Sequence, residues 1–401
     1  MTPVTTGRRY DLDWLRIGAF GLLILYHIGM VFVPWEFHIK TAAPQRWLEP
    51  VMMLSNAWRL SLLFLISGVA SRAMLARDPG PGRFARGRTA RLAVPLVAGM
   101  MLWVPPQAWV DITVNHGYRA GFGWFWTHDY FRFDEALGVA LPTWNHLWFV
   151  AYLWVYTLLL ALLLMLPAAM RAAAQRGFDR LFGGWWLVAV PTVYIATVRI
   201  GLADRFPETH GLTDDWCAHL IYGAAFLFGF GLGPGGAPWA VIARVWRPCL
   251  VAGIIGGGIV AGVNWSLAAD TVLSGGPLAA LRVARAVQAW GFIIGLIGLA
   301  QAHWQRDHRW RATLVEAVFP AYIAHQTVLI VVMYWLRPLG WSPLPEFVVL
   351  LAATMAGCTL FYLVGRRWRW LRPLVGLGPL RQPPIAPSWA SSQALRVTPP
   401  A

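Results

Sequence analysis

Residues 10–33 read YDLDWLRIGAFGLLILYHIGMVFV, and this stretch determines the class of fold. From Trp14 to Val33 it is a run of about twenty largely apolar residues, the length that crosses the hydrocarbon core of a bilayer. Two polar residues interrupt it, Arg16 near its start and His27 well inside. They are about three helical turns apart, roughly 16 Å along the axis, and lie on nearly the same face. Because an ionisable side chain inside a membrane costs about 2–3 kcal/mol or more, we interpret both as functional residues.

The composition of the whole chain is that of a polytopic membrane protein. Of its 401 residues, 58% are hydrophobic and only 13% are charged, whereas soluble domains carry roughly 25% charged residues. The net charge of +15 comes mainly from arginines in short loops between apolar stretches, which indicates membrane orientation rather than a nucleic-acid partner. The three cysteines, Cys217, Cys249 and Cys358, have neither metal nor disulfide spacing, so we expect packing residues and no metal site.

Ten apolar segments predict an all-α bundle of about ten transmembrane helices. Arginines concentrate in alternate loops, which predicts that both termini are cytoplasmic, with Arg282 and Arg285 as the main exceptions. We expect residues 1–372 to form one transmembrane domain and the Pro- and Ser-rich residues 373–401 to be a disordered cytoplasmic tail. The predicted segments are residues 14–33, 52–75, 92–110, 145–166, 185–201, 216–233, 249–269, 282–301, 314–336 and 346–365.

Four polar side chains from four predicted spans fall at one depth of the membrane. With the amino terminus inside, His27, Arg59, His146 and His325 all lie at mid-to-outer depth. A lone membrane histidine is more often bonded to a neighbouring helix, but a layer of four predicts a polar cavity. A neutral His27 in that cavity could accept a proton from a substrate hydroxyl, with Arg59 and His146 positioning the acceptor or polarising a carbonyl.

Two long outer loops, residues 34–51 and 111–144, carry Trp, His and acidic residues, including Trp124, Trp126 and His128. Such loops fit a site for a polar acceptor such as a sugar, and they fit an interfacial aromatic belt equally well.

The predicted cytoplasmic end is cationic. Arg16 begins the first span, and Arg88 and Arg91 lie one turn apart at the start of the third. Guanidinium groups at this spacing bind phosphates in bidentate fashion, while topogenic charge and attraction to anionic lipid explain them equally well. A phosphate-bearing donor inside and an acceptor outside would fit this arrangement. A transporter or flippase with a polar substrate path is the alternative, although we find no internal repeat.

The chain carries a set of short motifs in a fixed order: Leu12–Arg16 with ten residues before His27, Phe64-Leu-Ile-Ser67-Gly68, Arg88-Thr-Ala-Arg91, Asn145–Tyr152 and Tyr322–Gln326. This ordered set resembles the integral-membrane acyltransferase 3 family, bacterial enzymes that O-acylate envelope sugars and glycans. The last two motifs are similar to those of the glucan-modifying protein C subgroup, which adds succinyl groups to periplasmic glucans. One departure is that His146-Leu-Trp-Phe149 replaces the commoner fourth-span pattern, a Glu after a Trp-Ser-Leu core.

The resemblance implies a multi-pass protein of the bacterial inner membrane that binds acyl-coenzyme A from the cytoplasm. It would transfer an acetyl- or succinyl-type acyl group to a hydroxyl of a sugar or glycan on the outer side. By this likeness His27 is the catalytic histidine, His325 belongs to the same centre, and the donor is bound by Arg16, Arg88 and Arg91, with Ser67 and Gly68 of the second-span motif. An acyl-histidine intermediate and a direct transfer both remain open.

Overall fold

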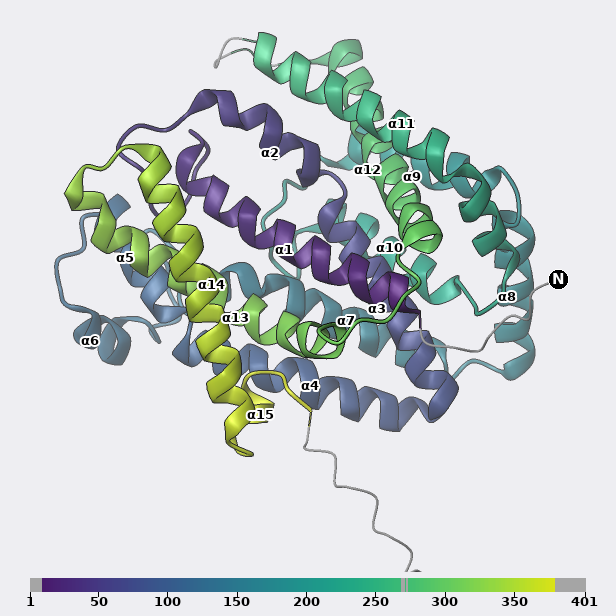
Figure 1. Cartoon of the computed structure of the whole chain (residues 1–401), viewed down its shortest axis with the longest axis horizontal. Helices are drawn as coiled ribbons and strands as arrows, with labels where there is room; N and C mark the ends of the chain where they lie inside the picture. The colour runs from purple at the N-terminus through teal and green to yellow at the C-terminus, as the bar shows by residue number, and fades with distance from the viewer. Residues whose placement is uncertain (1–8, 268–270, 272, 379–401) are drawn as a thin grey trace, which may run out of the picture.

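The computed structural model describes residues 9–267, 271 and 273–378, and this part of the chain is helical with no strand. Figure 1 shows α1 near the centre of the molecule, and α1 packs against α3, α12, α13 and α14. The helices are α1 (Tyr10–Phe32), α2 (Glu49–Asn56), α3 (Arg59–Arg77), α4 (Pro81–Leu102), α5 (Pro105–Asn115), α6 (Phe122–Trp124), α7 (Trp148–Leu163), α8 (Ala168–Phe182), α9 (Trp186–Leu202), α10 (Trp216–Gly231), α11 (Ala237–Ser266), α12 (Gly275–His303), α13 (Arg311–Leu336), α14 (Pro343–Arg367) and α15 (Leu371–Leu374).

The all-α membrane bundle is confirmed, and each of the ten predicted segments overlaps a helix, but residues 52–75 and 92–110 are each divided between two helices. Within the described residues, seven helical stretches are long and apolar enough to cross a membrane, and two bent pairs raise that number to nine. The bent pairs are α4 with α5, at 42°, and α8 with α9, at 98°. The tenth segment is α10, whose 16 residues make it shorter than a full span. The count of ten spans and the cytoplasmic placement of both termini therefore stay predictions.

Glycines allow helices to approach closely around the first span. A Cβ atom on Gly68 of α3 would lie 2.0 Å from the carbonyl oxygen of Phe226, and one on Gly229 of α10 would lie 1.9 Å from that of Leu65. Such distances are far inside van der Waals contact, so the α3–α10 interface requires glycine at both positions. Gly256 meets the backbone of α12 in the same way. These glycines therefore set the close approach of α3 to α10 and of α11 to α12.

Two helix breaks shape the centre of the bundle. The helical path of α2 ends at Asn56 and α3 begins at Arg59, so Arg59 occupies the first turn of a new helix. The α4–α5 bend falls at Pro105 and Pro106, which have no backbone N–H to continue the hydrogen-bond ladder of α4. Side chains bond backbone carbonyls beside both breaks: Gln288 donates to the carbonyl of Met53 at 2.9 Å, and Thr327 donates to that of Trp103 at 2.6 Å.

The packed chain continues past the predicted domain boundary at residue 372. That boundary falls inside α15, and Val375 and Leu377 beyond it are both buried at 4% exposure. The remainder of the predicted tail, residues 379–401, lies outside the described residues.

Candidate active site

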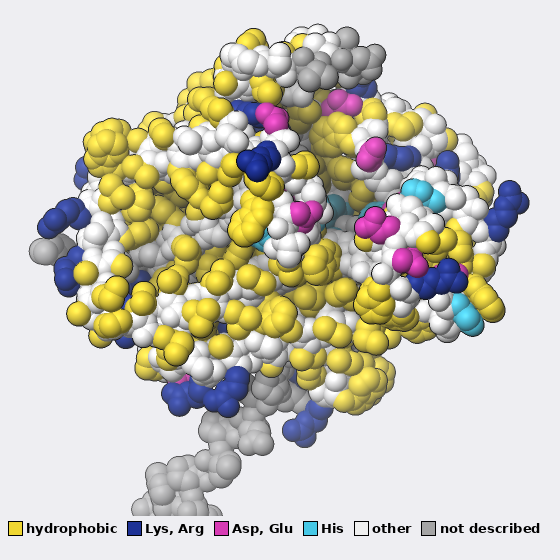
Figure 2. All heavy atoms as spheres, turned by 180° about the vertical axis from the view of Figure 1, so that it is seen from behind, with side chains coloured by type: hydrophobic (Ala, Val, Ile, Leu, Met, Phe, Trp, Pro, Cys, Tyr) yellow, Lys and Arg dark blue, Asp and Glu magenta, His cyan; other side chains and the backbone are white. Residues whose placement is uncertain are grey.

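A cavity of 470 Å³ opens among α1, α3, α13 and the loops that follow α1, precede α7 and follow α9. Figure 2 shows histidine side chains recessed in a hollow of one face, with acidic side chains around it. Three of the four residues predicted to form a polar layer, His27, Arg59 and His146, line this cavity. The fourth, His325, is fully buried directly behind His27. The structure therefore brings the four residues together, although their chemical roles stay predictions.

His27 and His325 form a directed hydrogen-bond chain. The Nδ1 atom of His325 lies 2.6 Å from the carbonyl oxygen of Tyr322, which can only accept, so this nitrogen carries the proton. In the neutral ring, Nε2 of His325 is then an acceptor, and Nδ1 of His27 at 2.8 Å donates to it. The Nε2 atom of His27 is left with a lone pair and, among the described residues, has no hydrogen-bond partner. The chain therefore presents an unprotonated nitrogen at the cavity.

His146 has protein partners on both ring nitrogens. Its Nε2 lies 3.1 Å from the carbonyl oxygens of both Tyr322 and Ile323, and its Nδ1 accepts from Gln107 at 3.4 Å. The hydroxyl of Tyr322 donates in turn to the backbone carbonyl of His146. These bonds join the start of α7 to the turn of α13 that anchors His325. The geometry gives His146 an organising role, and its predicted contact with an acceptor stays a prediction.

Arg59 brings a buried positive charge to the cavity. It is 2% exposed, donates from Nη1 to Ser55 Oγ at 2.8 Å, and has its guanidinium carbon 3.9 Å from the centre of the Tyr26 ring. Its Nε has no hydrogen-bond partner among the described residues. A planar cation held between a hydroxyl and an aromatic face keeps its remaining N–H groups available to an anionic group in the cavity.

Two groups of cavity residues were missed by the sequence reasoning. His38, from the loop after α1, pairs with Asp111 through Nδ1 and Oδ2 at 2.7 Å. Glu208, from the loop after α9, accepts from Tyr222 at 2.7 Å and lies 3.7 Å from His210. Partial desolvation opposes ionisation of this half-exposed carboxyl, but its contacts with His210 and Tyr222 and the charge of Arg199 lower the pKa of Glu208 to about 2. In the sequence, the only indication of a role for His38 and Glu208 was that each lies in a polar loop between apolar segments.

The aromatic part of the second outer loop lies elsewhere. Trp124 stacks on His128 with ring centroids 3.8 Å apart, and Trp126 donates to the carbonyl of Met101. Neither tryptophan lines the cavity, which instead takes Thr143, Trp144 and Asn145 from the end of this loop.

The three arginines of the predicted donor end gather at the other end of α1. Arg88 feels the charges of both Arg91 and Arg16, and Arg16 lies 3.5 Å from the carbonyl oxygen of Val315. The Nε atom of Arg88 is buried without a hydrogen-bond partner in the described part of the chain. Arg16 does not line the cavity of His27, so a continuous path between these two residues stays a prediction.

The second-span motif has contacts of helix packing. Ser67 donates to the carbonyl of Leu63 at 2.8 Å, and Gly68 lies against α10. Binding of a donor by either residue stays a prediction.

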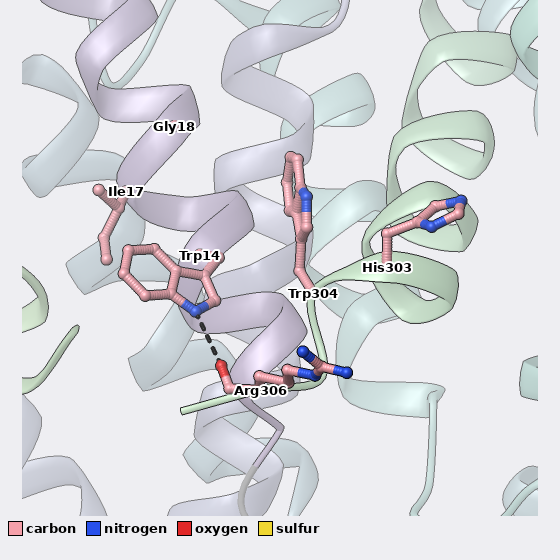
Figure 3. A pocket seen from close by; sticks show the side chains of 6 residues that line it. All are labelled: Trp14, Ile17, Gly18, His303, Trp304 and Arg306. Atoms are coloured by element: carbon pink, nitrogen blue, oxygen red, sulfur yellow. Dashed lines mark hydrogen bonds between the residues drawn. The ribbon is translucent and has the colours of Figure 1, made fainter. Parts of the chain in front are cut away.

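A second, shallower cavity of 380 Å³ lies beside the amino-terminal end of α1. Figure 3 shows Trp14 and Trp304 on its walls with Arg306, and the Trp14 indole donates to the Arg306 carbonyl at 3.3 Å.

Comparison with known proteins gives the same family as the motifs. The acyltransferase domain of the acyltransferase 3 family matches residues 9–363. Glucans biosynthesis protein C of Salmonella schwarzengrund is 27% identical over 157 residues, 39% of each chain. The protein of the same name from Escherichia coli is 28% identical over 159 residues, 40% of each chain. The chain thus spans about 40% of the length of these curated relatives, and no solved structure matches it. Because the domain match covers nearly the whole described chain, we conclude that the protein belongs to the acyltransferase 3 family.

Proposed function

We propose that the protein is a membrane O-acyltransferase that moves an acyl group from acyl-coenzyme A to a hydroxyl of a glycan. The observation that carries this proposal is the unprotonated Nε2 of His27 at the wall of the cavity, with its tautomer fixed by His325. Membership of the acyltransferase 3 family supports the class of reaction. The names of the two relatives support a glucan as the acceptor.

In the reaction, Nε2 of His27 takes the proton of the acceptor hydroxyl while the hydroxyl oxygen attacks the thioester carbon. The carbon–sulfur bond breaks, and the departing thiolate receives the proton from His27. As His27 becomes positively charged, its Nδ1–H bond to His325 strengthens, because hydrogen bonds to charged groups are the stronger ones. A positioned base of this kind contributes about 10²- to 10⁴-fold in rate.

Arg59 supplies the electrostatic part of the proposed catalysis. Attack on a thioester places negative charge on the carbonyl oxygen, and a fixed, buried cation stabilises that charge without reorganising. The Arg59 guanidinium is held by Ser55 and Tyr26 on the cavity wall, which suits this role.

The donor would bind with its phosphates at Arg16, Arg88 and Arg91. About three helical turns separate Arg16 from His27, roughly 16 Å at 1.5 Å per residue, a length comparable to the pantetheine arm of coenzyme A. The acceptor would enter from the side of the loops that carry His38 and Glu208. In this proposal the protein lies in the bacterial inner membrane, the donor binds from the cytoplasm, and the acceptor binds from the opposite side.

The test is release of free thiol from acetyl- or succinyl-coenzyme A by the purified full-length protein, with and without a gluco-oligosaccharide acceptor. We expect acceptor-dependent thiol release and an acylated sugar of matching mass. His27→Ala should lose both at an unchanged folded yield. Absence of thiol release with every donor, together with movement of the glycan across proteoliposomes, would favour a transporter instead.

A further inference from the structure

A second imidazole, that of His38 in the loop after α1, lines the cavity of His27. The Nδ1 atom of His38 donates to the carboxylate of Asp111 at 2.7 Å, so Nε2 of the neutral ring is an acceptor. That Nε2 lies 3.2 Å from the amide nitrogen of Gln326, which supplies the matching donor. His38 and His27 line the same cavity.

The orientation of the Gln326 amide follows from the network on its other side. Because Nε2 of His146 donates to backbone carbonyls, its Nδ1 accepts from the amide nitrogen of Gln107. The Gln107 oxygen therefore faces Gln326 and accepts from its nitrogen at 3.3 Å. Both contacts thus require that Gln326 directs its amide nitrogen to Gln107 and His38, and that Nε2 of His38 is the acceptor.

This orientation leaves one polar atom of the network, the side-chain oxygen of Gln326, without a hydrogen-bond partner among the described residues. The Gln326 oxygen is buried and has no hydrogen-bond partner among the described residues, although the residue is 97% buried and borders the cavity. Buried polar atoms are nearly always paired in folded proteins. An unpaired acceptor here indicates a place for a donor that a hydroxyl-rich ligand would bring.

We propose that His38 binds a second hydroxyl of the acceptor, next to the hydroxyl that reacts at His27. The site would then select acceptors with neighbouring hydroxyls, such as the ring of a sugar, over simple alcohols. The second hydroxyl replaces the 3.2 Å hydrogen bond from Gln326 to His38. This inference rests on the proposed acyl transfer, and it assigns His38 a positioning role rather than a proton-transfer role.

The test combines a His38 variant with deoxy acceptors. Acyl transfer from acetyl- or succinyl-coenzyme A is measured on a gluco-oligosaccharide and on its monodeoxy derivatives, using the full-length protein. For the wild type, we expect removal of the neighbouring hydroxyl to lower kcat/KM by about 10- to 100-fold, because the site is built to bond it. His38→Ala should lower kcat/KM for the full acceptor by a similar factor. In this variant, removal of the neighbouring hydroxyl from the acceptor should not lower kcat/KM any further.

Lys40→Ala is the matched control, since Lys40 anchors the same loop to α1 through the carbonyls of Met30 and Val33. We expect this variant to keep the full deoxy penalty. Additive losses from His38→Ala and the deoxy acceptor would overturn the inference, as would a Lys40→Ala variant that also loses the deoxy penalty. Absence of transfer by the wild type to any acceptor would instead remove the proposed function itself.

Discussion

His325→Ala is the substitution that most directly tests the directed chain of histidines. It removes the acceptor of the His27 Nδ1–H bond, 2.8 Å long, in a region where His325 itself has no solvent exposure. The proton on Nδ1 then lacks a partner when His27 takes up a second proton. A hydrogen bond to a charged group is worth about 1.5–3 kcal/mol. Since about 1.4 kcal/mol is tenfold in rate, kcat should fall by roughly 10- to 150-fold.

The assay is transfer of a radiolabelled acyl group from acyl-coenzyme A to a gluco-oligosaccharide by purified protein in proteoliposomes. The KM for acyl-coenzyme A should stay within about twofold, because His325 does not reach the arginines of the donor end. His325→Gln is the matched variant, since its side-chain oxygen can accept from His27 in place of Nε2. We expect this variant to recover most of the rate lost in His325→Ala.

Three results would contradict the reasoning. A wild-type rate in His325→Ala would mean that the hydrogen bond between His325 and His27 does not contribute to the rate of acyl transfer. Equal rates in the Ala and Gln variants would mean that hydrogen-bond acceptance is not the property required. A lower melting temperature in both variants would assign the loss to folding, so thermal unfolding is recorded for each.

Three further predictions concern packing, the donor end and pH. Gly229→Ala should lower the unfolding temperature, because its Cβ would lie 1.9 Å from a carbonyl oxygen of α3 and overpacking costs about 1–3 kcal/mol; Gly223→Ala on the same helix, whose nearest contact would be 3.6 Å, should be neutral. Arg88→Gln should raise the KM for acyl-coenzyme A with little change in kcat, whereas Arg86→Gln, at an exposed position of α4, should change neither in the same steady-state assay. Glu208 has its pKa lowered from 4.5 to about 2, so its ionised form stabilises the fold above about pH 4.5 and this contribution is lost as the pH falls toward 2. Glu208→Gln should therefore lower the unfolding temperature at pH 7, and its difference from the wild type should shrink in acid, as followed by thermal unfolding in detergent.

The apolar pattern was sufficient for the class of fold because helices in lipid must satisfy their backbone internally. Each predicted segment overlaps a helix, although residues 52–75 and 92–110 are each divided between two helices. The broken elements were less predictable. The 98° bend between α8 and α9 depends on how an exposed, polar α8 meets an apolar α9, which hydropathy along the chain does not give.

The candidate site was predictable only in part. His27, Arg59, His146 and His325 could be placed at one depth, because helical rise and loop charge fix depth along a span. His38 and Glu208 could not be placed in this way, because they lie in loops. The position of a loop residue depends on the path of the loop, which the sequence does not give. The same limit applies to Trp124 and Trp126, which share the composition of a binding loop and pack away from the cavity.

The sequence by itself determined that the chain is a helical membrane protein with an arginine and a histidine on one face of its first span. The tertiary structure alone decided which histidine nitrogen is free to react. His27 and His325 are 298 residues apart, and His325 in turn is tied to a carbonyl of its own helix. Because a neutral imidazole carries one proton, that partner fixes the proton on Nδ1 and leaves the lone pair on Nε2, facing the cavity.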